Sequence, residues 1–186
     1  MAMNFEELDG KTRGYMLSEF EAEQSGGNPY RPKGLSAMGL SAFPKLMREA
    51  IQNGNEETLK ASLSQTPLWN PTETYVRNGV ARERQLNVDQ ASERLALTEF
   101  NTWYVRGLAK RLTDEGISRC QAYRAAMPKW EPGECQSHEG QVFSVTEIFL
   151  GHRAKYWPEP GNPSAIAIPF GPGCHHTIRR GGDSKV

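Results

Sequence analysis

Cysteine is scarce in this sequence, and the number of cysteines is odd. The chain has 3, namely Cys120, Cys135 and Cys174, so they cannot all pair within one chain. This argues against a small secreted disulfide scaffold and is typical of a reducing compartment, where thiols stay free or bind metal. We therefore expect the protein to be made in the cytoplasm and to remain soluble there.

Long apolar runs and an excess of one charge are also missing. No run approaches the ~18 apolar residues of a membrane-spanning helix, and no basic-then-apolar leader begins the sequence. We therefore expect no membrane among its partners. Lys+Arg and Asp+Glu are balanced at 22 each, so the net charge does not indicate binding to nucleic acid or lipid. Phosphate loops and dinucleotide fingerprints are absent as well.

The apolar fraction is low for a compact protein, at 37%, while glycine (18) and proline (12) are frequent. A chain of 186 residues can still bury a core, so we expect an ordered body with loops or arms that contact a partner. We predict an α+β fold with a helical N-terminal part, a long central helix and a small β-rich C-terminal part. The expected division is 1–86, 87–180 and a flexible tail over 181–186.

Three helices are predicted before the hairpin. The first follows Asp9, the second covers Ser41 to Gln52 with Pro44 in its first turn, and the third is capped by Asn55.

The Asn78-Gly79 pair between β-prone flanks predicts a hairpin over Thr72–Gln85. Its arginines fit either an arm that touches phosphates or a solvated hairpin. Glu73 and Glu83 offset the charge and favour the solvated hairpin.

The longest predicted element is a helix from Asn87 to Glu115. Asn87 and Gln90 form a plausible capping box, and Gly116 is placed to end the helix in the left-handed conformation. Apolar side chains recur with helical spacing and predict one packing stripe: Leu97, Phe100, Tyr104, Leu108 and Leu112.

After this helix the pattern becomes β-like. It predicts strands over Cys120–Ala125, Gln141–Val145 and Ala165–Phe170, with a Trp- and Pro-rich loop over Lys155–Pro163. Arg179 to Asp183 is expected to be a disordered polar tail.

Two pairs of sulfur and imidazole side chains suggest a metal site. Cys135 and His138 are spaced to face one point across a turn, and Cys174 and His176 point the same way if their segment is extended. Two thiolates and two imidazoles close a tetrahedral zinc site, which predicts a structural ion without a catalytic role. The alternative is that Cys135 and Cys174 are ordinary buried thiols and the histidines are surface residues.

Catalysis is a weaker alternative. Cys174 with His138 or His152 is a possible nucleophile pair, but no nucleophile motif surrounds it. A zinc-supported nuclease needs a further histidine and a carboxylate, and four residues are candidates: His152, His175, Glu139 and Glu147.

Five segments between Ala91 and Ile178, about half the chain, form a recognisable series. They are Ala91–Asn101 with the Thr98-Glu99 pair, Asp114–Ile117, Cys135–His138, Gly140–Val145 and Gly171–His176. In this order they resemble the phage Mu protein F-like family of minor capsid, or head morphogenesis, proteins. The family's His-Pro-Asn-Cys ending is Gly171-Pro172-Gly173-Cys174 here, which loses one possible ligand and moves the fourth-ligand role to His138 or His176.

This resemblance implies a non-enzymatic structural part of a tailed-phage head, assembled in the bacterial host cytoplasm and located in the virion. Its expected partners are portal or capsid proteins within a larger assembly, with packaged DNA as a further expected contact. The rival hypothesis is a small zinc-containing nuclease or DNA-processing protein.

Overall fold

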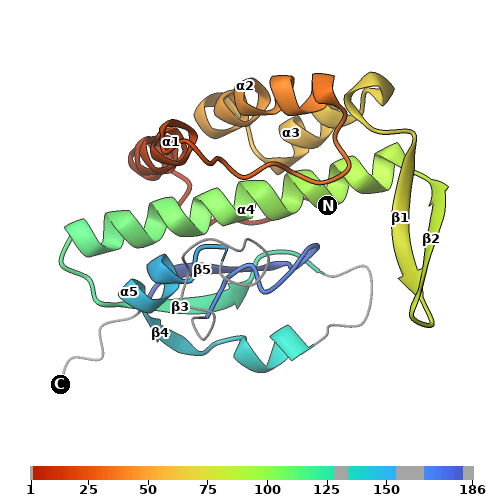
Figure 1. Ribbon diagram of the computed structural model, residues 1–186. Helices are drawn as coiled ribbons and strands as arrows, with labels where there is room; N and C mark the ends of the chain where they lie inside the picture. Colours follow the sequence, from red (N-terminus) through yellow and green to blue (C-terminus); the bar gives the residue numbers. More distant parts are fainter. Residues whose placement is uncertain (1, 128–133, 154–165, 182–186) are drawn as a thin grey trace.

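A long helix organises the computed structural model of this chain, which describes residues 2–127, 134–153 and 166–181. Helix α4 (Val88–Asp114) runs between a helical layer and a small sheet (Figure 1). The helical layer contains α1 (Gly10–Ser25), α2 (Ala37–Asn53), α3 (Glu56–Leu63) and the short 3-10 helix η1 (Thr66–Leu68). Mixed α+β architecture with a long central helix is confirmed.

Helix α4 begins and ends where its sequence signals place it. The side chain of Asn87 accepts a hydrogen bond from the Gln90 N–H at 3.1 Å, which caps the first turn. Gly116 has φ of 75°, and the following N–H of Ile117 donates to the Leu112 carbonyl at 2.8 Å. The predicted start and the glycine end are therefore confirmed.

The predicted single apolar stripe on α4 covers only part of the helix surface that is buried. Its five residues are buried, but so are others around the helix, including Ala96, Trp103 and Ala109. The reason is that α1 and α3 pack on one side of α4 while α5 (Val145–Leu150) and the sheet pack on the other (Figure 1). A helix covered on two sides loses the one-sided pattern of a surface helix.

Gly107 allows α1 and α4 to approach closely. A Cβ atom at Gly107 would lie 2.6 Å from the backbone nitrogen of Met16. Gly107→Ala is therefore expected to lower the free energy of unfolding by about 1–3 kcal/mol, because the helices must separate. The matched control is Gly14→Ala on α1, where a Cβ meets nothing within 4 Å and a gain of about 0.5–1 kcal/mol is expected. Urea denaturation measures both; equal effects would contradict the close approach.

Helix α2 starts earlier than predicted, at Ala37 instead of Ser41. The side chain of Ser36 accepts a hydrogen bond from the Gly39 N–H at 3.1 Å and so caps the helix one turn further upstream. Pro44 consequently lies inside the helix and not in its first turn.

The predicted hairpin is confirmed as β1 (Thr72–Arg77) and β2 (Val80–Gln85), which pair antiparallel. Asn78 and Gly79 have φ of 52° and 74°. Positive φ at both central residues is the type I′ turn that matches the strand twist. The hairpin projects from one end of the body (Figure 1).

The small sheet has the order β4-β3-β5, with β3 (Arg119–Arg124) in the middle and antiparallel neighbours. Strands β3 and β4 (Val142–Ser144) confirm two of the three predicted strands. The strand expected up to Phe170 is wrong: residues 166–170 contain no strand, and β5 (His176–Arg180) fills the third place. Arg179 and Arg180 therefore belong to a strand and not to a disordered tail.

Two further expectations, the loop over Lys155–Pro163 and most of the 181–186 tail, fall outside the described residues. Within the described residues, no helix is both long enough and apolar enough to cross a membrane. One cluster of buried apolar side chains extends from Met16 on α1 to Ile178 on β5, so both parts of the chain contribute to the same core.

A group of ionised side chains is enclosed beside this core. The guanidinium of Arg153 donates to both carboxylate oxygens of Glu99 on α4, at 2.9 and 2.8 Å, and the two side chains are 2% and 1% exposed. Its Nε also lies 3.2 Å from Glu23 on α1. The rings of Tyr30 and Trp103 flank the guanidinium at 4.3 and 5.1 Å. These contacts join α1, α4 and the end of α5.

Lowering the pH is expected to destabilise this region before most carboxylates become protonated. Burial lowers the pKa of His152 to about 4, although its hydrogen bond to Glu23 opposes the shift. An unfolded histidine binds its proton near pH 6.5, so the unfolded state gains protons first as the pH falls. The stability from neutral His152 is complete above pH 6.5 and is lost toward pH 4, by about 3 kcal/mol at most.

Denaturant titrations from pH 7.5 to 4 measure this loss, with His152→Gln as the control. Glutamine can still donate to Glu23 but does not titrate, so the pH slope in this window should shrink. An unchanged slope in His152→Gln would contradict the assignment to His152.

Glu23 acts at lower pH. Burial raises the pKa of Glu23, but the hydrogen bond from His152 and the charge of Arg153 outweigh burial and lower the pKa to about 2. The stabilisation from ionised Glu23 is therefore present above pH 4.5 and is lost toward pH 2.

Candidate metal centre

Three potential metal ligands meet near Arg124, the last residue of β3. Cys135 lies in the 3-10 helix η2 (Glu134–His138), which precedes β4, while Cys174 and His176 lie at the start of β5. One ligand atom from each residue lies within 4.8 Å of the other two. These three residues form a group that can hold a metal ion.

The distances fit a small tetrahedral ion. The Cys174 sulfur and Nδ1 of His176 are 3.7 Å apart. Zinc–sulfur bonds of about 2.3 Å and zinc–nitrogen bonds of about 2.0 Å at a tetrahedral angle place two such atoms roughly 3.5 Å apart. Little rearrangement is therefore needed for both atoms to contact one ion.

The turn before β5 presents these two ligands to the same side. Gly173 has φ of 78°, and the N–H of Cys174 donates to the Gly171 carbonyl at 3.1 Å, which closes a tight turn. The chain is then extended, so Cys174 and His176 are buried together. His175, between them, is half-buried and is not one of the three grouped ligands.

Helix α4 supports the turn through two polar side chains. The Gly173 N–H donates to Oγ1 of Thr98 at 3.2 Å, and Nδ2 of Asn101 donates to the His176 carbonyl at 2.7 Å. Both α4 residues are buried. The adjacent residues Thr98 and Glu99 therefore have different roles: Thr98 holds the turn before β5, and Glu99 binds Arg153.

A carboxylate lies behind the imidazole. Nε2 of His176 is buried without a hydrogen-bond partner within the described residues, and Oε2 of Glu139 is 3.6 Å away. Arg124 holds that carboxylate through two hydrogen bonds of 3.0 and 2.8 Å. A histidine that binds metal through Nδ1 carries its proton on Nε2 and commonly directs it at a carboxylate. The orphaned nitrogen and the nearby Glu139 thus fit a metal-bound His176.

The pKa values of the ligands determine how a metal ion would compete with protons for this site. Burial raises the pKa of the Cys174 thiol to about 11, and the nearby Cys135 thiol raises it further, while backbone N–H groups act in the opposite direction. Burial lowers the pKa of His176, so its imidazole is neutral at pH 7 and can act as a ligand. A metal ion held by these residues would therefore displace thiol protons, and its binding would strengthen as the pH rises.

His138 lies beside the group but outside it. Its ring stacks on Phe170 at 4.7 Å with an angle of 14° between the planes, and its Nδ1 is 3.4 Å from Oε1 of Gln141. The described structure thus brings together Cys135, Cys174 and His176, three of the four predicted ligands.

The other candidate residues are spread over the fold. His152 binds Glu23 and packs on Trp103, and Glu147 lies on α5. Cys120 is buried inside the sheet, where burial raises its pKa to about 12. The sequence pattern did not assign the supporting roles of Asn101 and Arg124, because no spacing rule links them to the ligands.

Searches against family models, curated protein sequences and solved structures gave no match.

Proposed function

We propose that Cys135, Cys174 and His176 hold a structural zinc ion and that the chain is a non-enzymatic assembly protein. The observation that carries the proposal is the position of the group. It joins the segment before β4 to the start of β5, the two outer strands of the same sheet. An ion there closes a long loop of the chain and stabilises the sheet by restricting the unfolded state.

The surroundings of the group support a structural ion more than a catalytic one. Cys174 and His176 are 8% and 2% exposed, and the stacked rings of His138 and Phe170 lie next to them. Of the residues that a nuclease was expected to use, His152 is hydrogen-bonded to Glu23, and Glu147 is an exposed residue of α5; neither belongs to the group of three ligands. Glu139 is adjacent, but Arg124 already donates two hydrogen bonds to its carboxylate.

Metal content tests the site directly. Protein purified without a metal-affinity tag and dialysed against buffered zinc is expected to retain one equivalent, measured by plasma mass spectrometry. Cobalt substitution should give the intense visible absorption of a tetrahedral site with sulfur ligands. Protein that retains less than a tenth of an equivalent would exclude a resident ion.

The setting we propose is the head of a tailed phage, as a minor capsid or portal-associated protein in contact with portal or capsid proteins and with packaged DNA. The resemblance of several segments to the Mu protein F-like family, in the same order along the chain, supports this setting. The genes that flank its locus test it: portal, terminase or capsid genes are expected there. A locus without any of them would contradict the phage role while leaving the metal site intact.

A zinc-containing nuclease or DNA-processing protein is the second candidate, favoured by one observation. The described residues supply three ligands, and catalytic zinc sites characteristically have three protein ligands and one open position. Incubation of the zinc-loaded protein with plasmid DNA, with and without Mg²⁺ from pH 6 to 9, distinguishes the two. Intact plasmid under all conditions supports the structural role, and cleavage that Cys174→Ser abolishes supports the enzyme.

A further inference from the structure

One edge of β1 has backbone groups that are not used by the fold. The register pairs Arg77 with Val80, and the Leu86 N–H donates to the Pro71 carbonyl at 2.9 Å. Because hydrogen-bonded pairs alternate in an antiparallel ladder, Thr72, Thr74 and Val76 direct their N–H and C=O groups away from β2. Within the residues that the structure describes, no strand pairs with this edge.

A cleft of about 740 Å³ lies along the same edge. Thr72, Glu73 and Thr74 line it consecutively. The facing walls are formed by the first half of α4 and by Tyr30, Arg31, Lys33 and Gly34. Successive strand residues point to opposite faces, so a space that touches three in a row lies beside the strand edge. Figure 1 agrees, because β1 is on the side of the hairpin toward the body and β2 is on the outer side. The open edge therefore faces room for one more strand.

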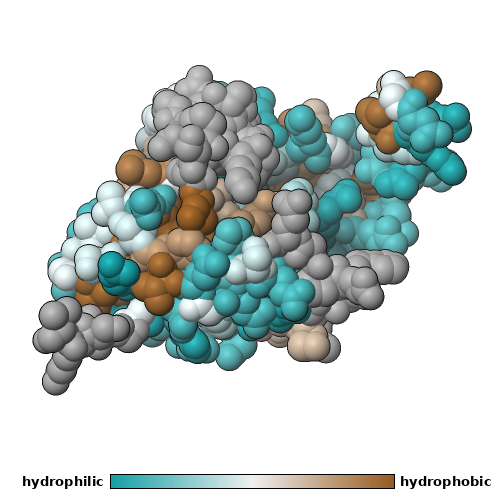
Figure 2. Space-filling view, turned by 90° about the horizontal axis from the view of Figure 1, so that it is seen from below, coloured by the Kyte–Doolittle hydropathy of each residue, from teal (hydrophilic) through white to brown (hydrophobic). Residues whose placement is uncertain are grey.

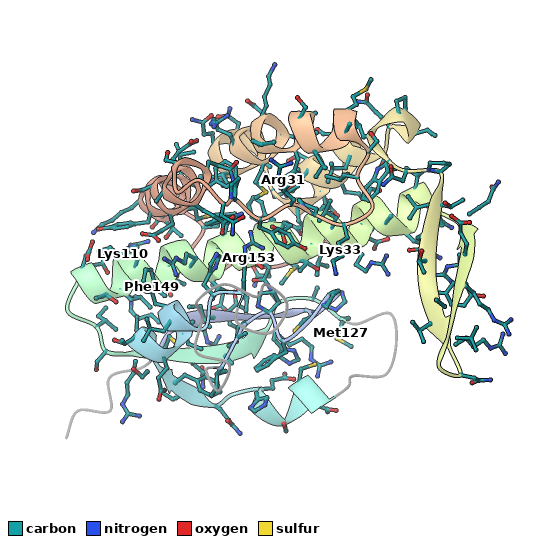
Figure 3. All side chains as sticks on the ribbon, viewed as in Figure 1. Arg31, Lys33, Lys110, Met127, Phe149 and Arg153 are labelled. Carbon is teal, nitrogen blue, oxygen red and sulfur yellow. The ribbon has the colours of Figure 1, made fainter. Side chains whose placement is uncertain are left out.

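The cleft has unpaired positive charge. Arg31 and Lys33 line it, are exposed, and have no hydrogen-bond or ion-pair partner among the described residues (Figure 3). Its acidic groups are already neutralised, since Glu73 pairs with Arg84 at 2.8 Å and Glu99 with Arg153. An occupant with negative side chains complements this surface.

In the part of the chain that the structure describes, the hairpin forms a two-stranded sheet that no third strand joins. Every residue of β2 is exposed, and the hairpin stands apart from the rest of the surface (Figure 2). Val76 and Val80 near its tip are 70% and 55% exposed. An isolated two-stranded hairpin is marginally stable in water. A third strand would add backbone hydrogen bonds along the open edge of β1.

We propose that an extended acidic peptide segment of a partner protein adds to β1 as a third strand. Backbone hydrogen bonds to Thr72, Thr74 and Val76 would give affinity, and Arg31 and Lys33 would select acidic side chains. An alternating row of N–H and C=O groups matches a peptide backbone, whereas a nucleic acid would use the cations alone. This site is separate from the metal centre, so the proposal does not depend on zinc.

The test uses the full chain and fluorescein-labelled eight-residue peptides with Glu at alternate positions and mixed Val, Ile, Thr and Tyr between them. Fluorescence anisotropy at low ionic strength is expected to show binding, and the same peptides with Lys in place of Glu should not bind. The Arg31→Glu, Lys33→Glu double variant should weaken binding by about tenfold or more, since two attractive charges become repulsive. Lys45→Glu changes an exposed cation outside the cleft that has no ion-pair partner among the described residues, and it should leave binding unchanged.

Two proline variants test the strand edge. Thr74→Pro removes a donor that points into the cleft, and Ala81→Pro removes an equivalent donor on the opposite edge of the hairpin. The first should abolish binding and the second should preserve it.

Amide resonances provide a second measurement that does not rely on variants. In ¹⁵N-labelled wild-type protein, the peptide should shift and protect the amides of Thr72, Thr74 and Val76. The proposal is overturned if those amides do not respond, if Thr74→Pro binds normally, or if a single-stranded oligonucleotide of equal charge binds more tightly. Equal peptide binding in zinc-free protein separates this result from the metal proposal.

Discussion

Cys174→Ser is expected to abolish the zinc-dependent stabilisation that we propose for the metal centre. Serine keeps the size of the side chain but is a far poorer ligand than a thiolate for a soft or borderline ion. At free zinc 100-fold above its dissociation constant, the wild-type protein gains about 2.7 kcal/mol from binding. For a chain of this length, that gain corresponds to a melting temperature higher by roughly 5–10 °C. Thermal unfolding with zinc and with a chelator measures the difference.

His175→Ala is the matched control for this prediction. His175 neighbours both ligands in sequence, but it is half-buried and is not one of the three residues that form the ligand group. In His175→Ala, zinc should raise the melting temperature as much as in the wild type. In Cys174→Ser, zinc should not raise it at all. The zinc-dependent increment is compared because either substitution can alter packing without any metal. Equal increments in both variants would remove the metal centre from the explanation.

Removing Glu99 is expected to destabilise the fold by about 3–5 kcal/mol. Glu99→Ala leaves the guanidinium of Arg153, 2% exposed, without its bidentate partner at the centre of the protein. Glu23 lies 3.2 Å from Nε and supplies only part of the lost compensation. Since an uncompensated buried charge costs more than a lost contact, the effect should exceed that of any exposed ion pair. Chemical denaturation at pH 7 measures it.

Two further variants show whether the cost arises from the buried charge. Arg84→Ala breaks the pair with Glu73, in which Arg84 is 57% exposed, and should change stability by no more than about 1 kcal/mol. Glu99→Leu combined with Arg153→Met removes both buried charges and should recover much of the loss. If the double variant is as unstable as Glu99→Ala, packing and not charge explains the effect.

Local sequence signals were sufficient where a short segment determines its own conformation. The hairpin follows from Asn78-Gly79, since few other pairs adopt positive φ at both positions at low cost. The ends of α4 follow from Asn87 and Gly116 for the same kind of reason. The long helix was also assigned correctly as a packing element, because its apolar spacing is helical.

Predictions from the sequence were wrong where the conformation of a segment depends on a neighbour that is distant in the chain. Ile166, Ala167 and Ile168 read as a strand, yet residues 166–170 pair with no strand. The edge of β3 is instead taken by His176–Arg180, whose polar ending reads as a tail. Strand pairing requires a partner with free backbone groups, and composition does not reveal that partner.

The sequence by itself determined the ligand types and the shared side of Cys174 and His176, because alternation in an extended chain is a local property. Tertiary structure alone decided that Cys135, far away in the chain, reaches them and that His138 stacks on Phe170 instead. It also decided that Glu99 meets Arg153. These pairings arise because β3 holds β4 and β5 on its two edges while α4 packs against β5 and α5, and such geometry has no counterpart in sequence spacing.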